Sequence, residues 1–187
     1  MSTDSWYSGT EDVLTNLAAS LVPVEKMITG AAYLMGIMFA IKAIMTLKTH
    51  GEQRSSMSGT GNIKEAGIYL IVAGMLVYYP TAFQVIMNST FGYQDVLAYA
   101  SGNSGSPWLS DIFGTDSAVG SSVVMIIQVI GLIAFIRGWL LIARSSAQGQ
   151  AAGGVGKGLM HVFGGVMAMN IVGTLEVFYN TLFGVSY

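Results

Sequence analysis

VGSSVVMIIQVIGLIAFIRGWLLIAR, residues 119–144, is the stretch that decides the fold. Before Arg144 it contains a single charged residue, Arg137. A helix of ~20 such residues is long enough to cross the ~30 Å hydrocarbon core of a bilayer. Trp139 and Arg144 stand near its end, and aromatic and basic side chains of this kind anchor a span at the membrane interface. The stretch therefore predicts a transmembrane helix.

The composition is typical of a polytopic membrane protein. Of the 187 residues, 52% are hydrophobic and 10% are charged, and the mean hydropathy is +0.59. Soluble domains carry about 25% charged residues, so this balance disfavours a soluble globular enzyme. The absence of cysteine excludes a disulfide or a thiolate site. Residues 1–13 are acidic, whereas a signal peptide begins with a basic region. They are therefore not predicted to be a signal peptide and are expected to stay on the mature protein.

A weak internal repeat divides the chain into two halves. The halves align in two blocks, residues 35–49 with 130–144 at an offset of 95 and residues 61–92 with 153–184 at an offset of 92. In the first block Lys42 matches Arg137, and the second block ends in N-x-x-F-G in both copies. The alignment predicts an all-α membrane protein with four transmembrane helices, arranged as two tandem helical hairpins.

The predicted segments follow one another along the chain. They are an N-terminal segment at 1–26, a first transmembrane hairpin at 27–92, a linker at 93–118 and a second transmembrane hairpin at 119–187. In the N-terminal segment, apolar residues at helical spacing over 13–22 predict a short helix that lies flat at the interface and ends at Pro23. The spans are expected at 27–47, 66–87, 119–144 and 159–182. Pro80 is expected to kink the second of them, because it removes a backbone hydrogen bond.

The basic residues predict the orientation. Seven of the eight lysines and arginines lie in or beside the two hairpin loops, namely Lys42, Lys48, Arg54, Lys64, Arg137, Arg144 and Lys157. Loops rich in Lys and Arg stay in the cytoplasm. The two hairpin loops are therefore predicted to be cytoplasmic, and the linker and both termini periplasmic.

Two cations, Lys42 and Arg137, lie inside predicted spans, where a charge costs a few kcal/mol on insertion scales. Two interpretations stay open. The side chains either snorkel to the headgroups, or they line an aqueous path or contact lipid phosphate or a partner. Lys48, Arg144 and Lys157, close to the ends of the spans, are candidates for the same contacts. Bound anionic phospholipid is the one ligand that this pattern suggests.

The other notable residues within the spans are polar or small. Glu176 lies in the fourth predicted span and aligns with Gln84 in the second. A proton relay would need a carboxylate at both positions, and Gln84 does not supply one. A polar contact between helices is therefore the favoured interpretation. Small residues mark faces where helices approach closely, at Gly36, Ala43, Gly131, Gly138, Gly164 and Gly165. Packing within one bundle and packing between subunits are both compatible with them.

No residue pattern predicts a catalytic or metal site. AGGVGKGL, residues 152–159, lacks the first glycine and the final Ser or Thr of a phosphate-binding loop. His50 and His161 are the only histidines, and neither has a second ligand at metal-binding spacing. We therefore expect no enzyme activity, no cofactor and no direct nucleic-acid site.

Four blocks of sequence carry a resemblance to a known family. They are EKMITGAAYLMGIMFAIKAIMTLKTHGEQRS (25–55), LIVAGMLVYYPTAFQVIMNSTFG (70–92), IGLIAFIRGWLLIARS (130–145) and GKGLMHVFGGVMAMNIVGTL (156–175). Each half, a two-span unit with a small basic loop, resembles the pilin of conjugative type IV secretion systems. The whole chain resembles the IcmC/DotE family of type IVB (Dot/Icm) secretion systems and TraQ of the related conjugation systems.

The resemblance implies a multi-pass protein of the bacterial inner membrane that supports translocation by assembly. Its partners would be membrane lipids, other inner-membrane subunits of the machine, a cytoplasmic ATPase complex, and further copies of itself in a homo-oligomer or mixed assembly. The alternative is a small transporter or channel in which Lys42, Arg137 and Glu176 line the path.

Overall fold

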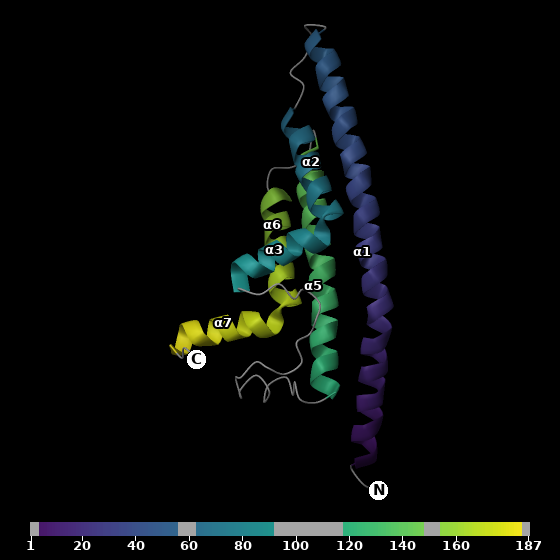
Figure 1. The fold of residues 1–187 in the computed structure, drawn as a ribbon, viewed down its shortest axis with the longest axis vertical. Helices are drawn as coiled ribbons and strands as arrows, with labels where there is room; N and C mark the ends of the chain where they lie inside the picture. Colours follow the sequence, from purple (N-terminus) through teal and green to yellow (C-terminus); the bar gives the residue numbers. More distant parts are fainter. Residues whose placement is uncertain (1–3, 56–62, 92–117, 148–153, 185–187) are drawn as a thin grey trace. The chain divides into compact units, whose positions relative to one another are not determined.

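The computed structural model describes residues 4–55, 63–91, 118–147 and 154–184. Every regular element in these ranges is a helix: α1 (Asp4–Ser55), α2 (Ile63–Val77), α3 (Tyr79–Phe91), α5 (Ala118–Ser145), α6 (Gly154–Met169) and α7 (Ile171–Phe183) (Figure 1). The predicted all-α class is confirmed for the described part of the chain. The predicted linker at 93–118 lies almost wholly outside it.

Two helices are long and apolar enough to cross a membrane. They are Asp12–Gln53 within α1 and Ser122–Ser145 within α5. α2 with α3 and α6 with α7 pass the same test only as pairs, and the two members of each pair are bent by 87° and 94°. The described residues therefore contain two helices that can span a membrane, or up to four if each bent pair forms one span.

The predicted helix end at Pro23 is wrong, because α1 continues through this proline as a helix of 52 residues. A proline inside a helix removes one backbone hydrogen bond and costs about 3 kcal/mol. Helix propagation adds one bond for each further residue, and apolar residues at helical spacing stand on both sides of Pro23. The long run of helix-forming residues therefore outweighs the proline.

The kink predicted at Pro80 is present, but it is a complete break, and it lies at Tyr78. Pro80 falls in the first turn of α3, where a missing N–H is not needed by the helix. The Tyr78 N–H donates to the carbonyl oxygen of Gly74 at 2.9 Å, and the Ala82 N–H donates to that of Tyr78 at 2.8 Å. Tyr78 therefore joins two helices that are nearly perpendicular (Figure 1).

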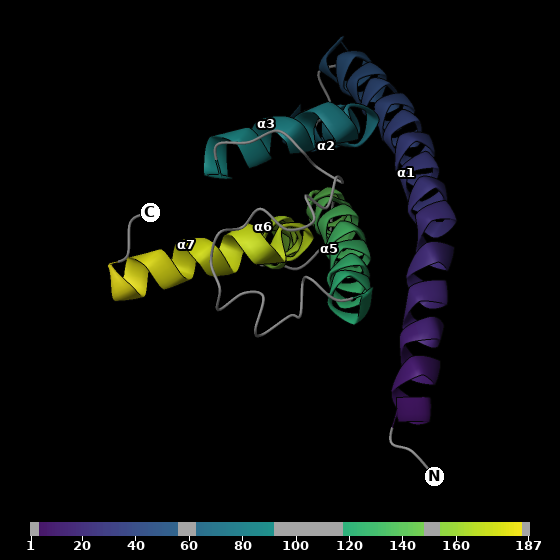
Figure 2. The ribbon, with the colours of Figure 1, turned by 60° about the horizontal axis from the view of Figure 1, so that its bottom comes forward.

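The fourth predicted span is also interrupted, which the sequence analysis did not anticipate. α6 ends before Asn170, whose side-chain oxygen accepts a hydrogen bond from the Gly173 N–H at 3.3 Å and so caps α7. The Thr174 hydroxyl donates to the Met167 carbonyl oxygen at 3.0 Å. These bonds satisfy backbone groups that a broken helix leaves open. α7 consequently leaves α6 at almost a right angle (Figure 2).

The two breaks occupy aligned positions. Tyr78 and Asn170 are 92 residues apart, the offset at which the second blocks of the two halves align. Different local chemistry produces the break in each half, a proline in the first and an asparagine cap in the second. Each half thus contains a long helix followed by a shorter helix that breaks at the same place.

The chain divides into two compact units that cut across the helices. Unit 1 comprises Met1–Met27, Gln84–Leu132 and Gly165–Tyr187, and unit 2 comprises Ile28–Phe83 and Ile133–Gly164. In unit 2 an aromatic cluster is buried, with Phe135 in contact with Tyr79 (5.7 Å between ring centroids) and Phe83 (5.9 Å). In unit 1 the buried side chains include Met87, Val124 and Met169.

Candidate functional site

In unit 2, α5 and α6 are antiparallel and touch through their glycines. A Cβ atom on Gly138 would lie 2.7 Å from the Gly158 carbonyl oxygen and 2.6 Å from a methyl group of Val162. A Cβ atom on Gly158 would lie 2.5 Å from the Ile142 side chain. Contacts this short leave no room for a side chain. The sequence alone had suggested small-residue packing here without saying which helix is the partner.

A second glycine contact recurs in the two halves. In unit 2, a Cβ atom on Gly36 would lie 2.9 Å from the backbone nitrogen of Val77. In unit 1, a Cβ atom on Gly131 would lie 2.7 Å from the backbone nitrogen of Met169. Val77 and Met169 are aligned residues, each the last of its helix before the break. Both long helices therefore meet the broken helix at the same point.

The remaining small residues differ in their surroundings. Ala43 is completely buried, and Gly165 is buried, with its carbonyl oxygen 2.8 Å from the Cβ position of Gly131. Gly164 is exposed, and no described atom lies within 4 Å of its Cβ position. Within the described residues, Gly165 contributes to helix packing and Gly164 does not.

Lys42 has a specific partner. Its Nζ atom lies 4.5 Å from the centroid of the Tyr69 ring, a cation–π distance. Tyr69 is buried, and its hydroxyl donates a hydrogen bond to Glu65 Oε1 at 3.0 Å. Phe39 stacks on the same ring at 5.9 Å. The ammonium group of Lys42 is thus one aromatic ring away from a carboxylate.

Sequence reasoning missed Tyr69 and Glu65. They are four residues apart on α2, so they share one face of that helix, and this spacing was a signal available in the sequence. Which residue of α1 they would meet depends on where the two helices cross, and the sequence does not specify that point.

The aligned positions of the second half carry different chemistry. Arg137 matches Lys42, but His161 stands where the first half has Tyr69, and Lys157 stands where it has Glu65. His161 Nδ1 lies 2.8 Å from the Lys157 carbonyl oxygen. Arg137 and Lys157 are exposed, and neither forms an ion pair with another residue that the structure describes. The structure gives no contact between Lys42 and Arg137 in the described ranges.

The other basic candidates, Lys48 and Arg144, lie on the surface at the ends of their helices. Lys48 Nζ lies 3.8 Å from Glu52 Oε1, and both side chains are largely exposed. An exposed pair of this kind contributes little stability. Arg144 is exposed in the last turn of α5.

Gln84 and Glu176 lie beyond the breaks, on α3 and α7, and not on the apolar helices before them. Gln84 is exposed and Glu176 is half-buried, and no contact between them is present among the described residues. The half-buried Pro80 lies two residues after the first break.

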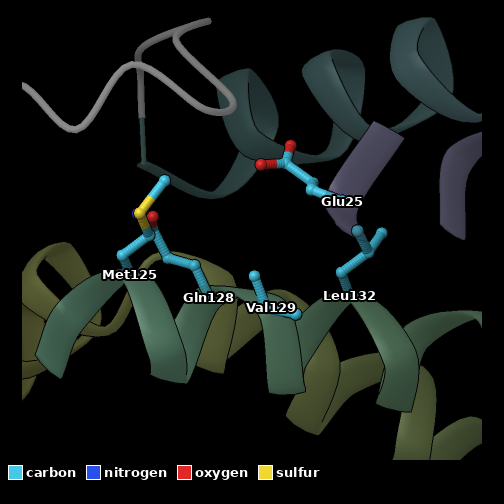
Figure 3. Close-up of a pocket in the computed structure, with 5 residues that line it drawn as sticks. All are labelled: Glu25, Met125, Gln128, Val129 and Leu132. Atoms are coloured by element: carbon cyan, nitrogen blue, oxygen red, sulfur yellow. The ribbon is translucent and has the colours of Figure 1, made fainter. Parts of the chain in front are cut away.

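Unit 1 contains a shallow cleft that sequence reasoning did not identify. Glu25 of α1 reaches it from one side, and α5 lines the other with Met125, Gln128, Val129 and Leu132 (Figure 3). One carboxylate and one amide among apolar side chains are too few polar groups to define a ligand. Over the described ranges, no three His, Cys, Asp or Glu side chains are grouped closely enough to hold a metal ion.

Comparison of the chain with protein-family models, with curated proteins and with solved structures finds no match. The chain's own residues and their geometry therefore carry the functional argument.

Proposed function

We propose that the chain is a structural subunit of the bacterial inner membrane that consists of two tandem pilin-like hairpins and acts by assembly in a type IVB secretion or conjugation machine. One observation carries the proposal. In both halves a long helix packs through a glycine, Gly36 or Gly131, against the last residue before an aligned helix break. This recurrence supports a duplicated hairpin as the building unit.

The lengths of the shorter helices support a particular arrangement in the bilayer. α2 has 15 residues and α6 has 16, so they are about 22 and 24 Å long at 1.5 Å per residue. This is close to, but less than, the ~30 Å core. In the proposed arrangement α2 and α6 cross a locally thinned bilayer, and α3 and α7 turn to lie along the periplasmic interface. Gln84 and Glu176, which lie on α3 and α7, would then be at headgroup level.

The exposed apolar faces support assembly as the mode of action. α1 carries large exposed side chains along its length, among them Met27, Leu34, Met38, Ile44 and Met45. In a bilayer such a face contacts either lipid or a further helix. On α2, Gly67 and Gly74 have no described atom within 4 Å of their Cβ positions, which leaves space for a helix of another subunit to approach closely.

The test is the size and composition of the purified assembly. The full chain, extracted in mild detergent and reconstituted into lipid discs, would be measured by mass photometry and electron microscopy. Large rings, filaments or a mixed complex with other secretion subunits are expected. A small, uniform homo-oligomer that conducts or transports a solute would reject the structural role and favour a transporter with Lys42, Arg137 and Glu176 along its path.

A further inference from the structure

No carboxylate stands beside the three basic residues of the second hairpin in the sequence. Between Asp116 and Glu176 the sequence contains Arg137, Arg144 and Lys157 but no Asp or Glu. The first hairpin has Glu52 beside Lys48 and Glu65 near Lys42, through Tyr69. The two hairpins share a helix arrangement and carry the same formal net charge, but only the first has carboxylates beside its basic residues.

The glycine contacts place three groups of the second hairpin on one side of it. Arg137 directly precedes Gly138 on α5, while Lys157 and His161 directly precede Gly158 and Val162, the residues that Gly138 touches on α6. In an antiparallel pair of right-handed helices, the residues that precede the contact residues lie on the same side of the pair.

The first hairpin shows that side chains at these positions reach each other. There Lys42 and Glu65 directly precede the buried residues Ala43 and Ala66. The Lys42 Nζ lies 4.5 Å from the Tyr69 ring, which is hydrogen-bonded to Glu65. In the second hairpin the same three positions hold Arg137, His161 and Lys157, all of them unit 2 residues.

We propose that Arg137, Lys157 and His161 form a binding site for a phosphate group, and that the group belongs to the headgroup of an anionic phospholipid. An arginine offers two parallel donors that match phosphate oxygens, and a lysine adds a second positive charge. The imidazole, held by its 2.8 Å contact with the Lys157 carbonyl oxygen, is a third polar group beside them. The first hairpin cannot form this site, since Glu65 would repel the phosphate.

The position in the membrane favours a lipid over a soluble phosphate. Arg137 lies eight residues before Ser145, the end of α5, which is about 12 Å along the helix. From that depth an arginine side chain extends towards the headgroups. Basic pockets between transmembrane helices are sites where anionic lipid headgroups bind. The inference requires only that α5 and α6 lie in the membrane, and it does not depend on the proposed role in secretion. Its failure would therefore leave that role unaffected.

The experiment is native mass spectrometry of the full chain in detergent, with phosphatidylglycerol and phosphatidylcholine titrated separately. The wild type should bind one phosphatidylglycerol about tenfold more tightly than phosphatidylcholine, the size expected from one or two charge-assisted contacts. Arg137→Gln and Lys157→Glu should each remove most of this preference. Lys64→Gln, which removes an exposed lysine beside the first hairpin's Glu65, is the matched control and should retain it.

Two further measurements and one replacement variant make the result decisive. Glu65→Gln should add a second phosphatidylglycerol, because it removes the carboxylate near Lys42. Millimolar inorganic phosphate should not displace the bound lipid, and complete displacement would assign the site to a soluble anion instead. If Lys157→Glu does not fold, Lys157→Gln serves in its place. An unchanged preference in Arg137→Gln and the Lys157 variant, or an equal loss in Lys64→Gln, would overturn the proposal.

Discussion

The carbonyl oxygen of Gly158 lies 2.7 Å from the position that a Cβ atom would take on Gly138, and the carbonyl oxygen of Gly138 lies 2.8 Å from the corresponding position on Gly158. The contact is therefore reciprocal and joins two backbones. Because a backbone atom cannot rotate away as a side chain can, both positions require glycine. This crossing also fixes which residues of α5 and α6 lie side by side.

Gly138→Ala should destabilise the protein by about 1–3 kcal/mol, the usual cost of overpacking a well-packed contact. Gly164→Ala is the matched control, since its Cβ position has no described atom within 4 Å, and it should be neutral or stabilise the helix by up to about 1 kcal/mol. Unfolding by SDS titration, followed by circular dichroism, measures both. Equal stability of the two variants would contradict the α5–α6 contact.

The contact between Lys42 and Tyr69 should appear as a coupling energy. A double-mutant cycle of Lys42→Gln and Tyr69→Leu is expected to give about 0.5–2 kcal/mol, the range of cation–π pairs. Tyr69→Phe should keep this coupling, because the ring remains, while losing about 1 kcal/mol with the hydrogen bond to Glu65. The exposed pair Lys48 and Glu52 is the reference, with an expected coupling of about 0.3–0.5 kcal/mol. A Lys42–Tyr69 coupling of zero would mean that the lysine only extends to the headgroups.

The Asn170 cap should stabilise the break between α6 and α7. Asn170→Leu removes the bond to the Gly173 N–H and should cost about 1 kcal/mol, whereas Asn170→Ser keeps a capping oxygen and should cost less. Spin labels at Met167 and Leu182, both exposed, report the distance across the bend by electron paramagnetic resonance. The distribution of distances between the two labels should broaden or shift to longer values in Asn170→Leu. It should stay the same in Asn88→Leu, a change at an exposed asparagine of α3. No change in either variant would show that the cap does not hold the bend.

The predicted topology can be tested with single cysteines, since the chain has none of its own. Ser56→Cys and Gln148→Cys, in the predicted cytoplasmic loops, should be protected from a membrane-impermeant thiol reagent applied to spheroplasts. Ser104→Cys and Ser186→Cys should react with it. All four positions lie outside the described residues. Labelling of either loop cysteine would reverse the predicted orientation.

The sequence predicted the helices better than their interruptions. Residues 119–144 contain no strong helix breaker, and α5 covers them. Pro23 predicts a helix end, but α1 continues through it because a proline within a long helix-forming run costs less than the run gains. Asn170 does not by itself predict a break, because the sequence does not show that its side chain caps a helix. Its alignment with Tyr78, near Pro80, was the one signal that could have revealed it.

The candidate site was predictable only in part. The alignment singled out Lys42 and Arg137, because it compares positions along the chain. It did not bring Tyr69 and Glu65 to Lys42, because that requires the point at which two helices cross. This point depends on backbone contacts such as Gly138 with Gly158, whose partners lie 20 residues apart in sequence.

The right-angle breaks also bear on how the protein is made. With 15 and 16 residues, α2 and α6 fall short of the ~17–25 residues that identify an independent transmembrane helix. A nascent segment of this length partitions poorly from the translocon into lipid by itself. It can enter the bilayer together with the long helix that precedes it, because the two helices pack closely through their glycines. Membrane insertion would then proceed one helix pair at a time, and not one helix at a time.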